Sequence, residues 1–425
     1  LLQHLFTSPQ AASLIHPKGV QIQGARIEGR LDLEGATVVH RLFIKDSAID
    51  QGIVLSDART RRLVLDGSHI GAIAGDNLVV GGSVAMRRTH VKGGLTLRDA
   101  SIEGTLDCTG GHLENPGGNA LHADRMTVKG GVFLRQGFQA KGEVRLPGAS
   151  IEGPLDCTGG HLENPGGYAL TLEQATVAGV AFLRSLELQG SLNLTSARVG
   201  QLYDDKGSWP AIGKLEIEGF EYAAFAGDDT PKSARERLEW LRLQPTGDFK
   251  PQTYDYLARV LRQMGREDDA ATVMMAKQED LIRRGQLNLW RKVVKRMFGW
   301  TVGHGYQSWR AMLGIFVFFV VGTLLFWWAE RQGLMVPLSP EVLTAQAYET
   351  TGAIPQDYPP FQAWLYSLDT LLPIIDLHQE AFWQPKFETP LGWAAFLYLR
   401  LHIVAGWFLS ALVAAASVGL VRRIE

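Results

Sequence analysis

The two cysteines of the chain each precede a histidine, in the segments Cys108-x3-His112 and Cys157-x3-His161. Thiolate and imidazole groups at such short spacing are the ligands of half a tetrahedral zinc site. Each cysteine ends a Leu-Asp-Cys segment, however, in which leucine and cysteine alternate like residues on one face of a strand. We therefore interpret both cysteines as core residues, and we predict no metal site, no cofactor and no disulfide framework.

Carboxylates and a hydroxyl group lie along an amphipathic stretch in the last third of the chain. Its apolar residues recur at helical spacing and are Phe361, Trp364, Leu365, Leu368, Leu371 and Leu372. The twelve residues that carry this face are too few to cross a bilayer. Residues 361–377 instead suit a re-entrant helix followed by an extended segment. Thr370, Asp369 and Asp376 are then the candidates to line an ion path, with a ring of Asp376 carboxylates as the favoured selective element. The alternative is an interfacial helix that packs only on the outer ends of the membrane spans.

Two segments without a charged side chain, 311–329 and 403–421, flank this stretch, and each is long enough to cross a bilayer. A basic amphipathic helix that suits an anionic membrane surface precedes the first; its cations are Arg291, Lys292, Lys295 and Arg296. Residues 330–402 carry eight acidic and three basic side chains. The positive-inside rule therefore predicts that both termini are cytoplasmic and that 330–402 faces outward.

Arg400 and His402 stand just before the second apolar segment. A charged side chain within a membrane is costly and often functional. One hypothesis is that Arg400 pairs with Asp369 or Asp376 and so fixes the loop. The alternative is that its long side chain only extends to the outer interface.

The order span, short helix, extended segment, span resembles that of two-transmembrane pore-loop cation channels. The resemblance implies a channel gated through its cytosolic domain and, since two spans cannot enclose a pore, a homo-oligomer. The sequence departs from that family where residues 370–376 read T-L-L-P-I-I-D. Potassium channels have T-V-G-Y-G there, so a ladder of backbone carbonyl groups is not expected. The alternative function is a non-catalytic membrane-anchored scaffold or protein-interaction module.

An internal repeat precedes the membrane part. Residues 100–121 and 149–170 are nearly identical, and a shorter unit, L-x-L-x-x-A-x-I-x-G, underlies both copies. Each half of this unit places alternate residues inward, as a short strand does, with a turn between the halves. Stacked units, two to a coil, predict a right-handed parallel β-helix (solenoid) of about eight coils over 20–222. The pattern fits either a three-sided or a four-sided cross-section.

The repeat region resembles the pentapeptide-repeat and bactofilin-like β-helices of bacteria, although its unit is not a strict pentapeptide. Residues 1–19 are expected to be an N-terminal cap, truncated because the chain starts with leucine rather than methionine. An α-helical linker is predicted over 223–300, with helices from Thr230-Pro231, over 251–264 and over 267–284. The last two look like one tetratricopeptide-type hairpin, which we interpret as a cap and spacer or, alternatively, as part of a peptide-binding groove. Residues 301–425 complete the chain as a two-helix transmembrane domain.

Composition and motifs argue against other classes of protein. The net charge of −2 gives no basic signature of nucleic-acid binding, and no nucleotide-binding or nucleophile motif is present, so we predict no enzyme. With its Tyr-Ser-Leu-Asp-x-x-Leu-Pro stretch at 366–373, the whole arrangement resembles a bacterial family sometimes labelled membrane-associated oxidoreductase. No residue pattern indicates redox chemistry, so that label is not carried over. The expected location is the inner or plasma membrane, and the expected partners are lipid, further copies of the chain and a cytosolic protein.

Overall fold

The computed structural model describes residues 2–8, 10, 15–16, 18–247, 249–284, 288–303, 307, 309–344, 348 and 353–417. The chain divides into two compact units, Leu1–Arg284 and Gly285–Glu425. This boundary cuts through the predicted linker. Residues 223–284 belong with the solenoid, and the remainder of the linker belongs with the second unit.

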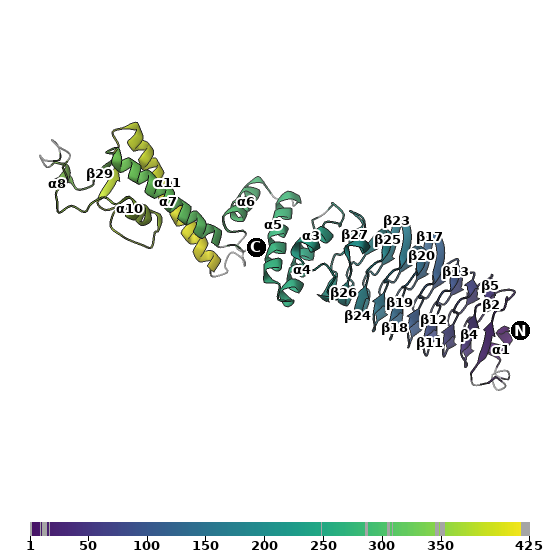
Figure 1. The fold of residues 1–425 in the computed structure, drawn as a ribbon. Coiled ribbons are helices and arrows are strands. Elements are labelled where there is room, and N and C mark those ends of the chain that lie inside the picture. The colour runs from purple at the N-terminus through teal and green to yellow at the C-terminus, as the bar shows by residue number, and fades with distance from the viewer. Residues whose placement is uncertain are drawn as a thin grey trace. The chain divides into compact units, whose positions relative to one another are not determined.

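The first unit is a parallel β-solenoid of about nine turns, close to the predicted eight. Its strands stack one above the next along the solenoid (Figure 1). Val20 pairs with Leu42 and Leu31 pairs with Ile53, so two repeat units make one turn, as predicted. The pairings form four parallel ladders, which makes the cross-section four-sided.

Most strands are short and belong to a single ladder. The first ladder contains β1 (Val20–Gln23), β4 (Leu42–Lys45), β8 (Leu63–Val64), β12 (Val84–Ala85), β16 (Leu106–Asp107), β19 (Val132–Phe133) and β22 (Leu155–Asp156). The second contains β5 (Ala48–Ile49), β9 (His69–Ile70) and β13 (His90–Lys92). The third contains β2 (Leu31–Asp32), β6 (Ile53–Val54), β10 (Ile73–Ala74), β14 (Leu95–Thr96) and β27 (Leu215–Glu216). The fourth contains β3 (Thr37–Val38), β7 (Arg59–Thr60), β11 (Val79–Val80), β15 (Ser101–Ile102), β18 (Thr127–Val128) and β21 (Ser150–Ile151).

Longer strands in the later turns run round a corner and serve two ladders. They are β17 (His112–His122), β20 (Gln139–Arg145), β23 (His161–Thr171) and β25 (Glu187–Asn193) for the second and third ladders. For the fourth and first ladders they are β24 (Thr176–Phe182), β26 (Arg198–Tyr203) and β28 (Glu221–Phe225). The two near-identical copies in the sequence therefore form equivalent corners, in β17 and β23.

The repeat unit turns at a residue with left-handed backbone geometry. Asp57 and Asn77 occupy this position in two units and Gly67 in another. Asp and Asn tolerate this geometry better than most residues, and Gly has no Cβ to clash. The turn positions the flanking L-x-L and A-x-I segments so that their apolar residues point inward, and Leu95 and Ile102 are both buried.

Helices close both ends of the solenoid. At its start, Phe6 of α1 (Leu2–Thr7) is buried in the core. The last turns of the solenoid include a short 3-10 helix, η1 (Lys206–Ser208). Three α-helices follow at this end: α3 (Ala234–Leu241), α4 (Pro251–Gln263) and α5 (Glu267–Arg284). The predictions for α4 and α5 are confirmed. The first helix begins at Ala234 rather than at Thr230-Pro231, because Ser233 and Glu236 form a capping box at its start.

The three helices are a cap of the solenoid rather than a separate module. Arg237 of α3 is fully buried, and its guanidinium donates to both carboxylate oxygens of Asp204, at 2.9 and 2.6 Å. Its Cζ lies 3.8 Å from the centre of the Phe225 ring. The Tyr256 hydroxyl of α4 accepts from the backbone N–H of Tyr222 and donates to the carbonyl oxygen of the same residue. One continuous apolar core runs from the solenoid into these helices.

The second unit is mainly helical. It contains α6 (Leu289–Val302), α7 (Trp309–Arg331), β29 (Met335–Pro337), α8 (Pro340–Leu343), α10 (Ala363–Leu371), β30 (Trp383–Pro385) and α11 (Pro390–Ser417), and β29 pairs antiparallel with β30. By length and composition, α7 and α11 could each cross a membrane. The first predicted span, 311–329, lies inside α7. The second helix starts at Pro390, well before the predicted 403, and positions 418–421 of that prediction lie outside the described residues.

Candidate functional site

The short helix α10 lies against both long helices, and it buries polar and apolar side chains there. Tyr366, Ser367 and Thr370 are buried, whereas Trp364 of the predicted apolar stripe is 51% exposed. Leu371 of the same stripe is fully buried, so the predicted stripe is divided between buried and exposed positions. The helix spans Ala363–Leu371, and Leu372 has extended backbone, so the predicted 361–377 divides into a short helix and a non-helical segment, as expected.

A network of polar side chains joins α10 to the two long helices. The Ser367 hydroxyl donates to the Phe319 carbonyl oxygen of α7, at 3.0 Å. His402 Nε2 lies 3.1 Å from the Ser367 carbonyl oxygen, and its Nδ1 lies 3.2 Å from the Tyr398 hydroxyl. Because a carbonyl oxygen can only accept, Nε2 carries the proton and Nδ1 accepts from Tyr398. The side chains of Ser367, Tyr398 and His402 thus all have partners in this contact, which favours one orientation of α10.

Two glycines allow α10 to approach the long helices closely. A Cβ at Gly322 would meet the Ser367 hydroxyl and the His402 ring, and a Cβ at Gly406 would collide with the Leu371 carbonyl oxygen. Phe319 and Gly322 lie near the midpoint of α7. The contact of α10 is therefore with the middle of the long helices, whereas the interfacial alternative predicted contact only with their ends.

Asp369 holds the segment that follows α10. Its side chain is only 7% exposed, and its carboxylate accepts from the backbone N–H of Leu377 at 2.6 Å and of Glu380 at 2.9 Å. Thr370 also bonds within the chain, since its hydroxyl donates to the Tyr366 carbonyl oxygen at 2.7 Å. Both residues were predicted to line an ion path, and the structure gives both side chains a positioning role.

Asp376 is the predicted pore residue whose side chain is free to meet solvent. Its side chain is 75% exposed and pairs locally with His378, at 3.0 Å. It borders an open cavity of ≈ 340 Å³ together with Glu380 and Arg400. Partial burial raises the pKa of Glu380, and the negative charges of Asp369 and Asp376 raise it further. Two acidic side chains and one arginine thus border this cavity.

Arg400 precedes the predicted apolar segment at 403 and lies within α11, because that helix already begins at Pro390. Its guanidinium stacks over the Phe396 ring, with 4.8 Å between Cζ and the ring centre. Within the described part of the chain it forms no ion pair with Asp369 or Asp376, so the structure does not contain the hypothesised pair. The carboxylate of Asp369 is already satisfied by backbone N–H groups.

The basic residues predicted at the membrane surface lie on α6. Arg291, Lys292, Lys295 and Arg296 share this helix with exposed Trp290 and Trp300, so it is amphipathic as predicted. Phe298 on the same helix packs against α7 and α11.

The structure also decides the role of the two cysteines. Cys108 and Cys157 are buried in the solenoid core, as predicted, and burial raises the pKa of the Cys108 thiol to about 12. His112 lies on the outside, with its ring centre 5.8 Å from that of His90. Cysteine and histidine of the Cys-x3-His segment thus lie on opposite faces of the wall. No group of three or more metal-binding side chains is found among the described residues.

Sequence reasoning missed the contact of Ser367, Tyr398 and His402. The available signal was polar residues inside apolar helical segments, with Tyr398 and His402 one helical turn apart. That spacing indicates a shared face, but not which helix the face meets.

Comparisons with known proteins give no match: no protein-family model, no curated protein and no solved structure corresponds to this chain.

Proposed function

We propose that the chain is a subunit of a homo-oligomeric pore-loop cation channel in the cell membrane, with the solenoid unit in the cytosol. One observation carries the proposal. Helix α10 buries Ser367 and Thr370, together with apolar Leu371, against the middle of two long apolar helices, and it leaves Trp364 exposed and Leu368 half-buried. A helix whose polar side chains are satisfied inside while part of its apolar surface stays exposed suits surroundings of lipid or of another apolar subunit.

The long helices support a membrane location. Only 17% of the apolar window of α7 and 28% of that of α11 is buried inside the structure. A core helix of a soluble protein would bury most of such a window. Trp309, Trp327 and Trp407 are exposed along these helices, as residues that contact lipid or its interface often are. The basic helix α6 then lies at the cytoplasmic surface, where anionic lipid attracts it.

The direction of α10 supports a pore loop. Tyr366, in its first half, packs edge-to-face on Phe326 near the end of α7, with ring centres 4.9 Å apart. Its last residue, Leu371, lies beside Gly406 in the middle of α11. The helix therefore enters from the outer side and ends at mid-depth. Its negative dipole end points to where a cation in transit would be most poorly solvated.

The segment after α10 supplies the element that would face the pore. Ile374 is 90% exposed, and Asp376 is exposed beside it. In an oligomer this segment and the apolar stripe of α10 would meet the neighbouring subunits. Asp376 carboxylates would then form a ring at the mouth of the pore. In each subunit the buried Asp369 would hold this segment through its hydrogen bonds to Leu377 and Glu380.

The test is ion flux into proteoliposomes that contain the purified full chain. We expect cation flux from the wild type and at least a tenfold loss of flux or of cation selectivity in Asp376→Asn. Asp357→Asn serves as the matched control, because Asp357 is an exposed carboxylate of the same outward segment away from α10. Its flux should equal that of the wild type.

Two outcomes would contradict parts of the proposal. Flux from neither variant nor wild type would remove the channel and leave the membrane-anchored scaffold as the function. Equal flux from wild type and Asp376→Asn would keep the channel but reject Asp376 as its selective residue.

A further inference from the structure

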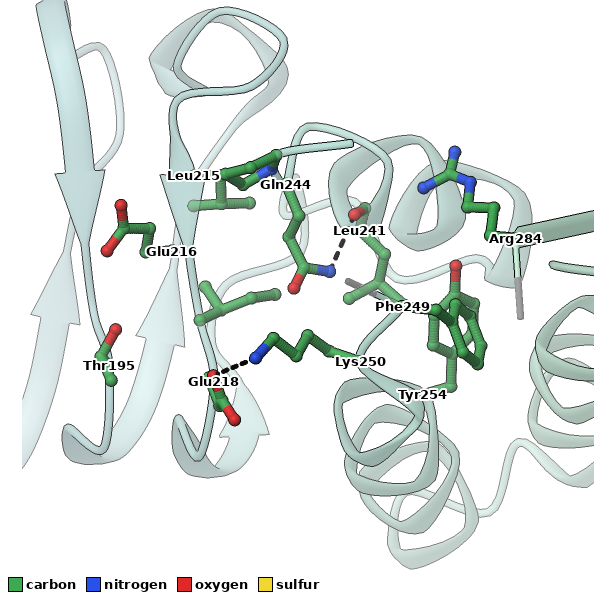
Figure 2. A pocket seen from close by; sticks show the side chains of 12 residues that line it. Thr195, Leu215, Glu216, Glu218, Leu241, Gln244, Phe249, Lys250, Tyr254 and Arg284 are labelled. Carbon is green, nitrogen blue, oxygen red and sulfur yellow. Dashed lines mark hydrogen bonds and ion pairs between the residues drawn. The ribbon is translucent and has the colours of Figure 1, made fainter. Parts of the chain in front are cut away.

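An open cavity of ≈ 240 Å³ lies where the last solenoid turn meets the helical cap (Figure 2). Leu215 and Glu216 line it from the solenoid, and Leu241, Phe249 and Arg284 line it from the cap. Leu215 and Leu241 belong to the continuous apolar core, yet the side chains around them leave this space open. A concave space with apolar walls and a few convergent polar groups is the usual form of a small-molecule site.

Most charged groups at this cavity are already committed to partners. Lys250 Nζ lies 2.8 Å from the Glu218 carboxylate, a contact drawn in Figure 2. Glu216 accepts a hydrogen bond from the Tyr168 hydroxyl at 3.0 Å. Arg284 differs, because among the residues described here its guanidinium makes no hydrogen bond or ion pair. The cavity therefore offers a ligand one uncommitted positive charge.

The aromatic wall of the cavity is anchored by a ring contact and a hydrogen bond. The Phe249 and Tyr254 rings lie 5.5 Å apart, side by side in Figure 2. The Tyr254 hydroxyl donates to the Asp280 carboxylate at 2.8 Å, which fixes that ring in place. An aromatic or aliphatic body can pack on this fixed wall without first ordering it, which lowers the entropic cost of binding.

We propose that this cavity binds a small organic anion, with its carboxylate or phosphate group on Arg284 and its apolar body against Phe249. The planar guanidinium matches the paired oxygens of either group and binds them through two parallel hydrogen bonds. The apolar body replaces water between the rings and Leu241. This site does not depend on whether the chain conducts ions.

The test is isothermal titration of the full chain in mild detergent with benzoate, phenyl phosphate and the uncharged analogue benzamide. We expect saturable binding of at least one anion and at least tenfold weaker binding of benzamide. Arg284→Gln should weaken binding of the anion at least tenfold. Arg283→Gln is the matched control, because Arg283 is the neighbouring exposed arginine and does not line the cavity.

Saturable binding of benzoate alone would identify carboxylates as the ligand class, and binding of phenyl phosphate alone would identify phosphates. Three results would overturn the proposal: no saturable binding of either anion, benzamide bound as tightly as the anions, or equal affinity in Arg284→Gln and wild type. Arg284 is exposed, so its substitution should leave the fold intact, and an unchanged unfolding temperature would verify this.

Discussion

Replacing Asp369 by alanine should release the segment that follows α10. The buried carboxylate accepts two backbone hydrogen bonds, from Leu377 at 2.6 Å and from Glu380 at 2.9 Å. A hydrogen bond to a charged group contributes about 1.5–3 kcal/mol. Glu380 lies at the surface, where water can replace one of these bonds, so we expect Asp369→Ala to weaken the closed loop by about 2–4 kcal/mol.

Hydrogen–deuterium exchange of the full chain in detergent measures this opening directly. A loss of about 2–4 kcal/mol corresponds to roughly 30-fold to 1000-fold faster exchange of the amides of Leu377 and Glu380. Asp369→Asn should give a smaller effect, because the amide keeps one accepting oxygen but turns an NH2 group toward a backbone donor. Asp376→Asn is the control, since its exposed carboxylate pairs only with His378.

The reasoning fails if the loop amides exchange at the same rate in Asp369→Ala and wild type. It fails equally if Asp376→Asn accelerates exchange as much as Asp369→Ala does, because the segment would then depend on local charge rather than on the buried acceptor. In either case Asp369 would return to the set of residues available to an ion path.

Three further substitutions test a buried ion pair, a close helix contact and a titrating carboxylate. Arg237→Met should destabilise the first unit by about 3–5 kcal/mol in denaturant unfolding, because it leaves the buried Asp204 carboxylate without its partner. Arg235 is an exposed arginine of the same helix, and Arg235→Met should change stability by less than about 0.5 kcal/mol. Gly406→Ala should lower stability in detergent by about 1–3 kcal/mol, because the new Cβ would collide with the Leu371 carbonyl oxygen. Gly314→Ala should be neutral, because its Cβ would make only ordinary contacts. Burial opposes ionisation of Asp66, but hydrogen bonds from an arginine outweigh it and lower the pKa of Asp66. The folded state therefore binds fewer protons there than the unfolded state, so this stabilisation is present above about pH 4 and is lost as the pH falls below that value. The pH dependence of urea unfolding between pH 2 and 6 should be shallower in Asp66→Asn.

The solenoid could be predicted from the sequence because its information is local and repeated. Each unit carries its own inward L-x-L pair and its own turn residue, and stacking of equal units leaves one register that buries both. The number of sides of the cross-section could not be predicted in this way. It depends on the angle at which the chain turns at every corner, and the repeat pattern does not encode that angle. Likewise, α4 and α5 each carry an apolar stripe and are bounded by proline or glycine, and both were predicted correctly.

The candidate site was predicted only in part, for a reason that lies in its surroundings. Helical periodicity located α10 but did not indicate which of its side chains meet the long helices, where Ser367 and Leu371 pack inward while Trp364 does not. Asp369 and Asp376 look alike in the sequence, seven residues apart in one acidic stretch. The difference arises because the chain folds back after α10 and brings the backbone N–H groups of Leu377 and Glu380 onto Asp369. Residue types and periodicity do not show that fold-back.

The length of α11 decides between the two interpretations of Arg400. Its 28 described residues extend over roughly 42 Å, about 12 Å more than the hydrocarbon core of a bilayer. On the proposed topology at least this excess lies at its start, where Trp393 is exposed at the outer interface. Arg400 then lies at most about one helical turn inside the hydrocarbon, within reach of the interface by its own side chain. Its stacking on Phe396, one turn nearer the start of the helix, points it that way. A guanidinium that reaches the interface needs no carboxylate partner. Asp369 can then hold the loop after α10, and Asp376 can stand at the mouth of the proposed pore.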